Sequence, residues 1–183
     1  MTDSPSQIVA GTQPEQVLED QLVAQLDALG YSKVDVTDEA SMLANLKAQV
    51  QLFNDVTLTD GEFTKVLHHL NKQSGVFNKA GILRDRMKLT KDDGDTVYLE
   101  FFDSANPLRN LFQVTQQVTM EGTYKNRYDV TILVNGLPLV QIELKRRGLE
   151  MKEAFNQIQR YQKHTFWSGH GLFHFVQLFV ISN

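Results

Sequence analysis

The sequence predicts an α/β fold, because a helical pattern fills its N-terminal part, a strand pattern its middle, and a helix followed by a strand its end. In the first 70 residues apolar side chains recur every three or four positions, the period of an amphipathic helix. After Gly81 the pattern changes to that of strands, and the Asn-Gly pair at 135–136 is typical of a β-hairpin.

Three helices are expected in the N-terminal part. Gly30 follows the first apolar stripe as a helix stop, and Thr59 and Glu62 have the spacing of a capping box at the start of the third. Residues 1–12 are polar and small, so we expect a flexible N-terminus and a folded domain over residues 13–183. The expected helices cover residues 14–29, 39–53 and 59–70.

The second half is expected to hold most of the sheet. Strands are expected over residues 82–89, 96–102, 112–120, 128–134, 137–145 and 173–182, with a helix over 150–164. The chain stops on an apolar strand without a closing helix, so we expect an N-terminal piece of a longer polypeptide.

Composition narrows the class of protein. The 183 residues suffice for one domain with a sizeable core, and 42% hydrophobic with 22% charged residues excludes disorder for the bulk of the chain. Cys is absent, which excludes disulfides and thiolate metal sites. No apolar run reaches about 18 residues, and the N-terminus lacks the regions of a secretory signal. We therefore expect a cytoplasmic protein.

Charge is unevenly distributed along the chain. The net charge is −4, yet residues 122–170 carry 8 Lys and Arg against 4 Asp and Glu. A basic segment on an acidic body is consistent with a local contact to a polyanion, and equally with ordinary solvated charge.

The candidate chemistry lies on the expected hairpin. Glu143 and Lys145 are two apart and point to one face of their strand, whereas Leu144 points to the other. Asp129 lies on the partner strand, and two converging carboxylates suit Mg²⁺. A neighbouring Lys can position a water and neutralise charge on a phosphate. The alternative is a surface carboxylate with an ion-paired Lys.

Hairpin geometry tests this idea. With a two-residue Asn-Gly loop Val134 faces Leu137, and Asp129 then falls opposite Ile142. That register would place the two carboxylates on opposite faces, so a shared metal site requires an odd loop or a β-bulge. Asn-Gly also suits a type I turn with a Gly bulge, and bulges often occur beside active sites. We predict such an irregularity.

These residues resemble the PD-(D/E)xK nuclease motif, with Tyr128 in place of Pro. Over roughly residues 15–183 the chain is similar to the restriction (R) subunit of type I restriction-modification enzymes. The most specific part is Val-Asn-Gly-Leu-Pro-Leu at 134–139, which leads into Ile-Glu-Leu-Lys at 142–145. Further matches are residues 110–117, Gly122, residues 127–129 and the Gln-x-x-x-Tyr motif at 157–161. Residues 19–31 resemble the first helix of these nuclease domains.

The resemblance implies a restriction-endonuclease-like core with a mixed β-sheet flanked by helices, and Mg²⁺-dependent hydrolysis of phosphodiester bonds in double-stranded DNA. It implies a downstream ATP-driven motor, with methyltransferase and specificity subunits as partners. The chain contains no Gly-x-x-x-x-Gly-Lys-Ser/Thr, so ATP would serve only the motor. The alternatives are a standalone resolvase or repair nuclease of the same fold, and a non-catalytic module that docks DNA or other subunits.

The resemblance also implies roles for the central residues. Asp129, Glu143 and the backbone carbonyl of Leu144 would bind Mg²⁺, and Lys145 would position or activate the hydrolytic water. Glu19 on the first helix could complete the metal site.

For further residues the resemblance implies a functional role, but a purely structural role also explains them. Glu15 is the alternative to Glu19, and both could be plain charges favoured at a helix start. Gln157 and Tyr161 share a helix face and would help to position DNA and the catalytic residues, although Tyr161 could equally be a core tyrosine. The candidate phosphate contacts are Lys125, Arg127, Arg160 and Lys163.

Overall fold

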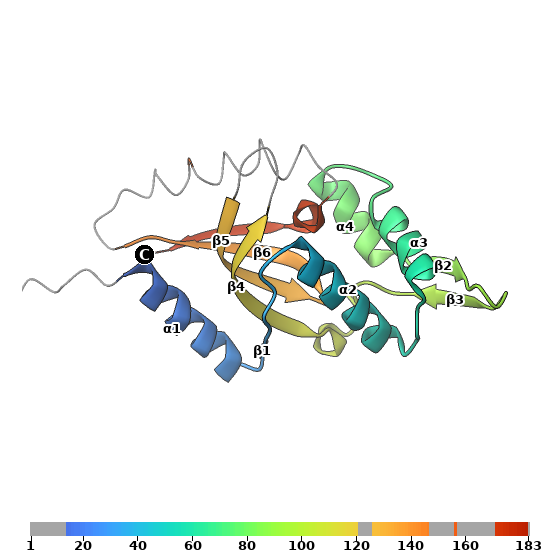
Figure 1. Ribbon diagram of the computed structural model, residues 1–183, viewed down its shortest axis with the longest axis horizontal. Helices are drawn as coiled ribbons and strands as arrows, with labels where there is room; N and C mark the ends of the chain where they lie inside the picture. Colours follow the sequence, from blue (N-terminus) through green and yellow to red (C-terminus); the bar gives the residue numbers. More distant parts are fainter. Residues whose placement is uncertain (1–13, 121–125, 147–155, 157–170, 183) are drawn as a thin grey trace, which may run out of the picture.

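The structure is a computed structural model that describes residues 14–120, 126–146, 156 and 171–182 (Figure 1). Its helices are α1 (Glu15–Ala28), α2 (Glu39–Asn54), α3 (Asp60–Leu70) and α4 (Val76–Arg84), with short 3₁₀ helices η1 (Pro107–Arg109) and η3 (Leu172–Phe175). Its strands are β1 (Ser32–Lys33), β2 (Met87–Thr90), β3 (Thr96–Leu99), β4 (Phe112–Met120), β5 (Asn126–Val134), β6 (Leu137–Leu144) and β7 (Leu178–Ser182). None of the described helices is long and apolar enough to cross a membrane.

Five strands form one mixed sheet in the order β1-β4-β5-β6-β7. Strands β4, β5 and β6 are antiparallel, whereas β1 and β7 run parallel to their neighbours. The remaining hairpin, β2–β3, lies at the far end of the molecule from α1 (Figure 1). The predicted α/β class, a mixed sheet flanked by helices as in restriction-endonuclease-like cores, is confirmed.

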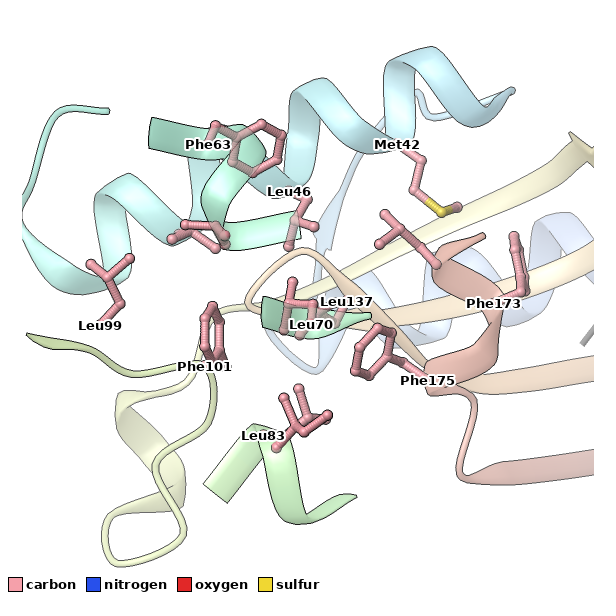
Figure 2. Close-up of a cluster of buried hydrophobic side chains, with 14 of the residues drawn as sticks. Met42, Leu46, Phe63, Leu70, Leu83, Leu99, Phe101, Leu137, Phe173 and Phe175 are labelled. Atoms are coloured by element: carbon pink, nitrogen blue, oxygen red, sulfur yellow. The ribbon is translucent and has the colours of Figure 1, made fainter. Parts of the chain in front are cut away.

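Two apolar clusters hold the helices to the sheet. The smaller one packs α1 on the sheet through Val23, Val114, Val130, Ile142 and Leu144. The larger one joins α2, α3, α4 and η3 to the strands. Figure 2 shows its labelled side chains gathered around Leu137, at the hairpin tip, and Phe175 of η3.

The three N-terminal helices lie where their apolar stripes predict them. The capping box of α3 is confirmed, because Glu62 N–H donates to Thr59 Oγ1 at 3.1 Å and Thr59 N–H donates to Glu62 Oε2 at 2.9 Å. Helix α2 has an equivalent box that pattern analysis missed, formed by Asp38 and Ser41.

Two of the predicted strands begin with residues that are helical, and the strand expected over 96–102 ends at Leu99. Residues 82–84 end helix α4 instead of beginning a strand, and residues 172–175 form η3. Short apolar runs fit a buried helix turn as well as a strand, and only tertiary packing distinguishes them. The two-residue strand β1 was also missed. The predicted helix over 150–164 lies outside the described residues, apart from a helical Asn156.

The predicted hairpin irregularity is confirmed, but its place differs. The loop is a regular two-residue turn with Asn135 and Gly136 both at positive φ (50° and 83°), not a type I turn with a Gly bulge. Val134 pairs with Leu137, and the register then shifts between Leu133 and Ile132. The bulge therefore lies within the strands.

The turn itself is buried. Asn135 Nδ2 donates to Phe101 O and to Asn110 Oδ1, both at 2.9 Å, and Asn135 Oδ1 accepts from Leu111 N–H at 2.8 Å. A Cβ on Gly136 would lie 2.8 Å from Cα of Leu46 in α2. The Asn-Gly pair thus packs the hairpin tip against α2.

Candidate active site

Asp129 and Glu143 meet where strands β5 and β6 part. The paired register ends at Val130–Ile142, and the next position along each strand holds one of the two carboxylates. Leu144 N–H donates to Asp129 Oδ2 at 2.8 Å. The bulge supplies the one-residue shift that brings the two carboxylates opposite each other, so the geometric condition for a shared site is met.

Strand β7 holds the other side of the site. Glu143 pairs with Ile181 and Leu144 with Ser182 in a parallel register. Lys145 N–H donates to Ser182 O at 2.9 Å, and Lys145 Nζ lies 3.2 Å from Glu143 Oε1. The lysine is therefore fixed by its backbone and by an ion pair with the neighbouring carboxylate.

Both carboxylates are buried, and their negative charges repel each other. Glu143 is fully buried and Asp129 is 7% exposed. The pKa of Glu143 is raised to about 7, mainly by burial and also by the Asp129 charge, while Lys145 opposes the rise. Burial also raises the pKa of Asp129, whereas the Leu144 N–H and Lys145 lower it. A cation placed between the two groups would relieve this repulsion.

The donor set fits a divalent cation of the Mg²⁺ type. Glu143 Oε2 is buried and has no hydrogen-bond partner within the described structure. Paired carboxylate oxygens are the ligands that Mg²⁺ prefers. Within the described residues, no three His, Cys, Asp or Glu side chains form a group that could hold one metal ion, so Glu19 does not join a three-carboxylate cluster there.

Both acidic candidates of helix α1 lie near the pair. Glu19 is 1% exposed and accepts from Gln117 Nε2 at 3.1 Å. Burial raises the pKa of Glu19, and the Asp129 charge adds to that rise. Glu15 is partly exposed, and its charge raises the pKa of both Asp129 and Glu143. Their roles at the metal remain predictions.

The other predicted site residues divide into two groups. Arg127 is exposed on β5, and its charge lowers the pKa of Asp129 and of Glu19, which places it beside the acidic site. Lys125, Gln157, Arg160, Tyr161 and Lys163 lie outside the described residues.

Gln117 is the residue of this site that pattern analysis left without a role. It contacts Glu19 from strand β4. One signal in the sequence could have indicated an irregular strand here. Gln116 occupies the position between Val114 and Val118 at which a regular alternation predicts an apolar residue.

A family model described as the type I restriction enzyme R protein N terminus matches residues 12–183. The chain belongs to this family. The match spans both the hairpin with its carboxylates and the helices that cover the sheet.

Curated relatives carry names that agree with the family. The type I restriction enzyme SsaAORF53P endonuclease subunit of Staphylococcus saprophyticus is 47% identical over 93% of this chain. The type I restriction enzyme EcoprrI endonuclease subunit of Escherichia coli is 44% identical over 96% of it. A putative subunit of this kind from Methanocaldococcus jannaschii is 24% identical. The chain spans 18% of the length of the staphylococcal relative and 58% of the E. coli one.

Proposed function

We propose that this chain is the endonuclease domain of a type I restriction enzyme R subunit, which hydrolyses phosphodiester bonds of double-stranded DNA with Mg²⁺. The observation that carries the proposal is the meeting of Asp129 and Glu143 at the parted strands, with Lys145 3.2 Å from Glu143 and one buried Glu143 oxygen that has no partner among the described residues. Membership in the R protein family and the relatives' names support it.

The proposed roles follow from the chemistry of each group. Asp129, Glu143 and the Leu144 carbonyl would hold Mg²⁺, which when bound supplies polarisation of a phosphate oxygen and a lowered pKa of coordinated water. Lys145 would orient the attacking water and neutralise the charge that builds on the phosphate. Its ion pair with Glu143 places the ammonium group beside the carboxylate that would bind the metal.

The wider assembly is proposed from the family. The relatives are named as subunits, which supports a complex with methyltransferase and specificity subunits over a standalone resolvase or repair nuclease. ATP-driven translocation would belong to a motor outside this chain, and we place the complex in the cytoplasm, where DNA and ATP meet. Arg127 would contact the DNA backbone near the site.

Plasmid cleavage by the assembled complex tests the proposal. Lys145→Ala should lower the rate about 10²- to 10³-fold at saturating Mg²⁺ and ATP, the usual effect of losing one group that stabilises transition-state charge. Lys88→Ala, which removes an exposed lysine from strand β2, is the matched control and should cleave like the wild type. Equal cleavage by wild type and Lys145→Ala would assign the activity elsewhere and leave this chain as a docking module.

A further inference from the structure

Gln117 has an unusual backbone for a residue within a strand. Its φ is +58°, in the left-handed region. Residues other than Gly rarely adopt this conformation, because their Cβ then lies too close to the following carbonyl oxygen. The residues on either side pair regularly with β5, Gln116 with Val130 and Val118 with Tyr128. Gln117 and Asp129 face each other between these pairs, and neither is paired in this ladder. The distortion thus lies directly opposite a candidate catalytic carboxylate.

The same position reverses the faces of both strands. Alternation would put Val114 and Val118 on one face of β4, yet Val114 packs under α1 and Val118 belongs to the larger cluster. On β5, Val130 packs under α1, whereas Tyr128 belongs to the larger cluster and stacks on a phenylalanine at 4.2 Å. Both strands therefore change face at the level of Gln117, and Asp129 lies at this change.

The Gln117 side chain connects the distortion to helix α1. Its amide donates to Glu19 Oε2 at 3.1 Å and contacts Gln16. The preceding Gln116 donates to Asp20 Oδ1 at 3.2 Å, so two consecutive strand residues reach the same helix. A regular strand would send one of them to the opposite face. The left-handed backbone is what directs the Gln117 amide to the buried Glu19.

We propose that Gln117 is a positioning residue for the acidic site. Its left-handed backbone on β4 turns the facing segment of β5 so that the Asp129 carboxylate reaches Leu144 N–H opposite Glu143, and its amide binds the Glu19 carboxylate. Strained backbone that is retained next to a reactive group is a recurring feature of pre-organised sites. The inference rests on the nuclease function proposed above, because it assigns Gln117 to the same reaction.

Substituting Gln117 by Gly and by Ala separates positioning from simple stability. In an ordinary strand Gly is less favourable than Ala, but at positive φ the order reverses because Gly lacks Cβ. The assembled complex would carry Gln117→Gly or Gln117→Ala, with Gln116→Gly and Gln116→Ala as the matched pair in regular strand backbone. Two experiments are made: plasmid cleavage at varied Mg²⁺ gives kcat and KM, and hydrogen exchange gives the Mn²⁺-induced protection of peptides within residues 126–145.

Both Gln117 variants lose the amide and should cleave more slowly than the wild type. Gln117→Ala should have a kcat about tenfold below that of Gln117→Gly, with KM for DNA unchanged, because small misplacement of reacting groups lowers the chemical rate. Mn²⁺-induced protection should be weaker in Gln117→Ala than in Gln117→Gly. Gln116→Gly and Gln116→Ala should not show this difference between Gly and Ala. Equal kcat and equal protection for Gln117→Gly and Gln117→Ala overturn the inference alone. A wild type that neither cleaves nor gains protection overturns the nuclease function and the inference with it.

Discussion

The two ends of the β5–β6 hairpin are both buried and polar, but they are built in opposite ways. At the turn, the side-chain amide of Asn135 has partners for both its donors and its acceptor, and Gly136 fits closely against α2. At the open end, Glu143 is equally buried, yet one of its oxygens has no partner in the described structure and its pKa is raised to about 7.

This contrast separates stability from chemistry within one motif. Buried polar groups that are fully satisfied stabilise a unique packing, whereas a buried carboxylate beside another carboxylate destabilises the fold until a cation binds. The turn therefore serves to dock the hairpin on α2, whereas the candidate reactive groups Asp129, Glu143 and Lys145 lie at the open end.

Substituting Gly136 by Ala should have the largest effect on stability. The new Cβ would lie 2.8 Å from Leu46 Cα, at a backbone φ of +83°. Left-handed strain and overpacking together should lower the free energy of unfolding by about 3 kcal/mol or more, measured by chemical denaturation. Gly94→Ala is the matched control, because Gly94 has a φ of +94° with open space around it and should show the strain alone. Equal losses at both positions would show that the turn does not depend on its fit to α2.

Substituting Asn135 by Asp should have the next largest effect. The change keeps the shape but replaces two donated hydrogen bonds, to Phe101 O and Asn110 Oδ1, by contacts between acceptors. Leaving these buried groups unsatisfied should cost about 2 kcal/mol, read from the denaturation midpoint. Asn106→Asp, on an exposed position before η1, should change stability little. An unchanged stability of Asn135→Asp would contradict the view that the hydrogen bonds of Asn135 stabilise the buried turn.

Substituting Glu143 by Gln should have a smaller effect of the opposite sign. Burial raises the pKa of Glu143 to about 7, so between pH 4.5 and 7 the folded protein keeps a proton that the unfolded chain has released, and metal-free stability falls as pH rises through this range. Removing the charge relieves this cost but also removes the ion pair with Lys145, so the net gain in stability should be about 1 kcal/mol at pH 8 in EDTA, with a flatter pH dependence, while cleavage is lost.

The matched control is Glu62→Gln. Glu62 is also buried, but its two oxygens accept from Thr59 N–H and Asp92 N–H, both at 2.9 Å. Loss of these charge-assisted bonds should destabilise the protein, opposite to the change at Glu143. If Glu143→Gln also destabilises the metal-free protein, the open end of the hairpin is a structural ion pair and the comparison fails.

Local patterns in the sequence were sufficient for much of this fold. The apolar stripes of the first three helices, the Thr59–Glu62 box and the hairpin around Asn-Gly depend on residues a few positions apart, and all three are confirmed. The need for a bulge between Asp129 and Glu143 also followed from sequence, because strand side chains alternate with a fixed period of two.

What only the tertiary structure decided depends on contacts between distant segments. Whether residues 82–84 and 172–175 are helical or extended is set by the shared core, since short apolar runs suit either state. The hydrogen bond of the left-handed Gln117 to Glu19 joins two residues that are 98 positions apart in the chain. The burial of Glu143 depends on the pairing of β7 with β6. Sequence therefore indicated which groups are candidates for the chemistry, and tertiary packing decided their burial, their pKa values and their orientation, because desolvation and strain arise only when the whole fold surrounds them.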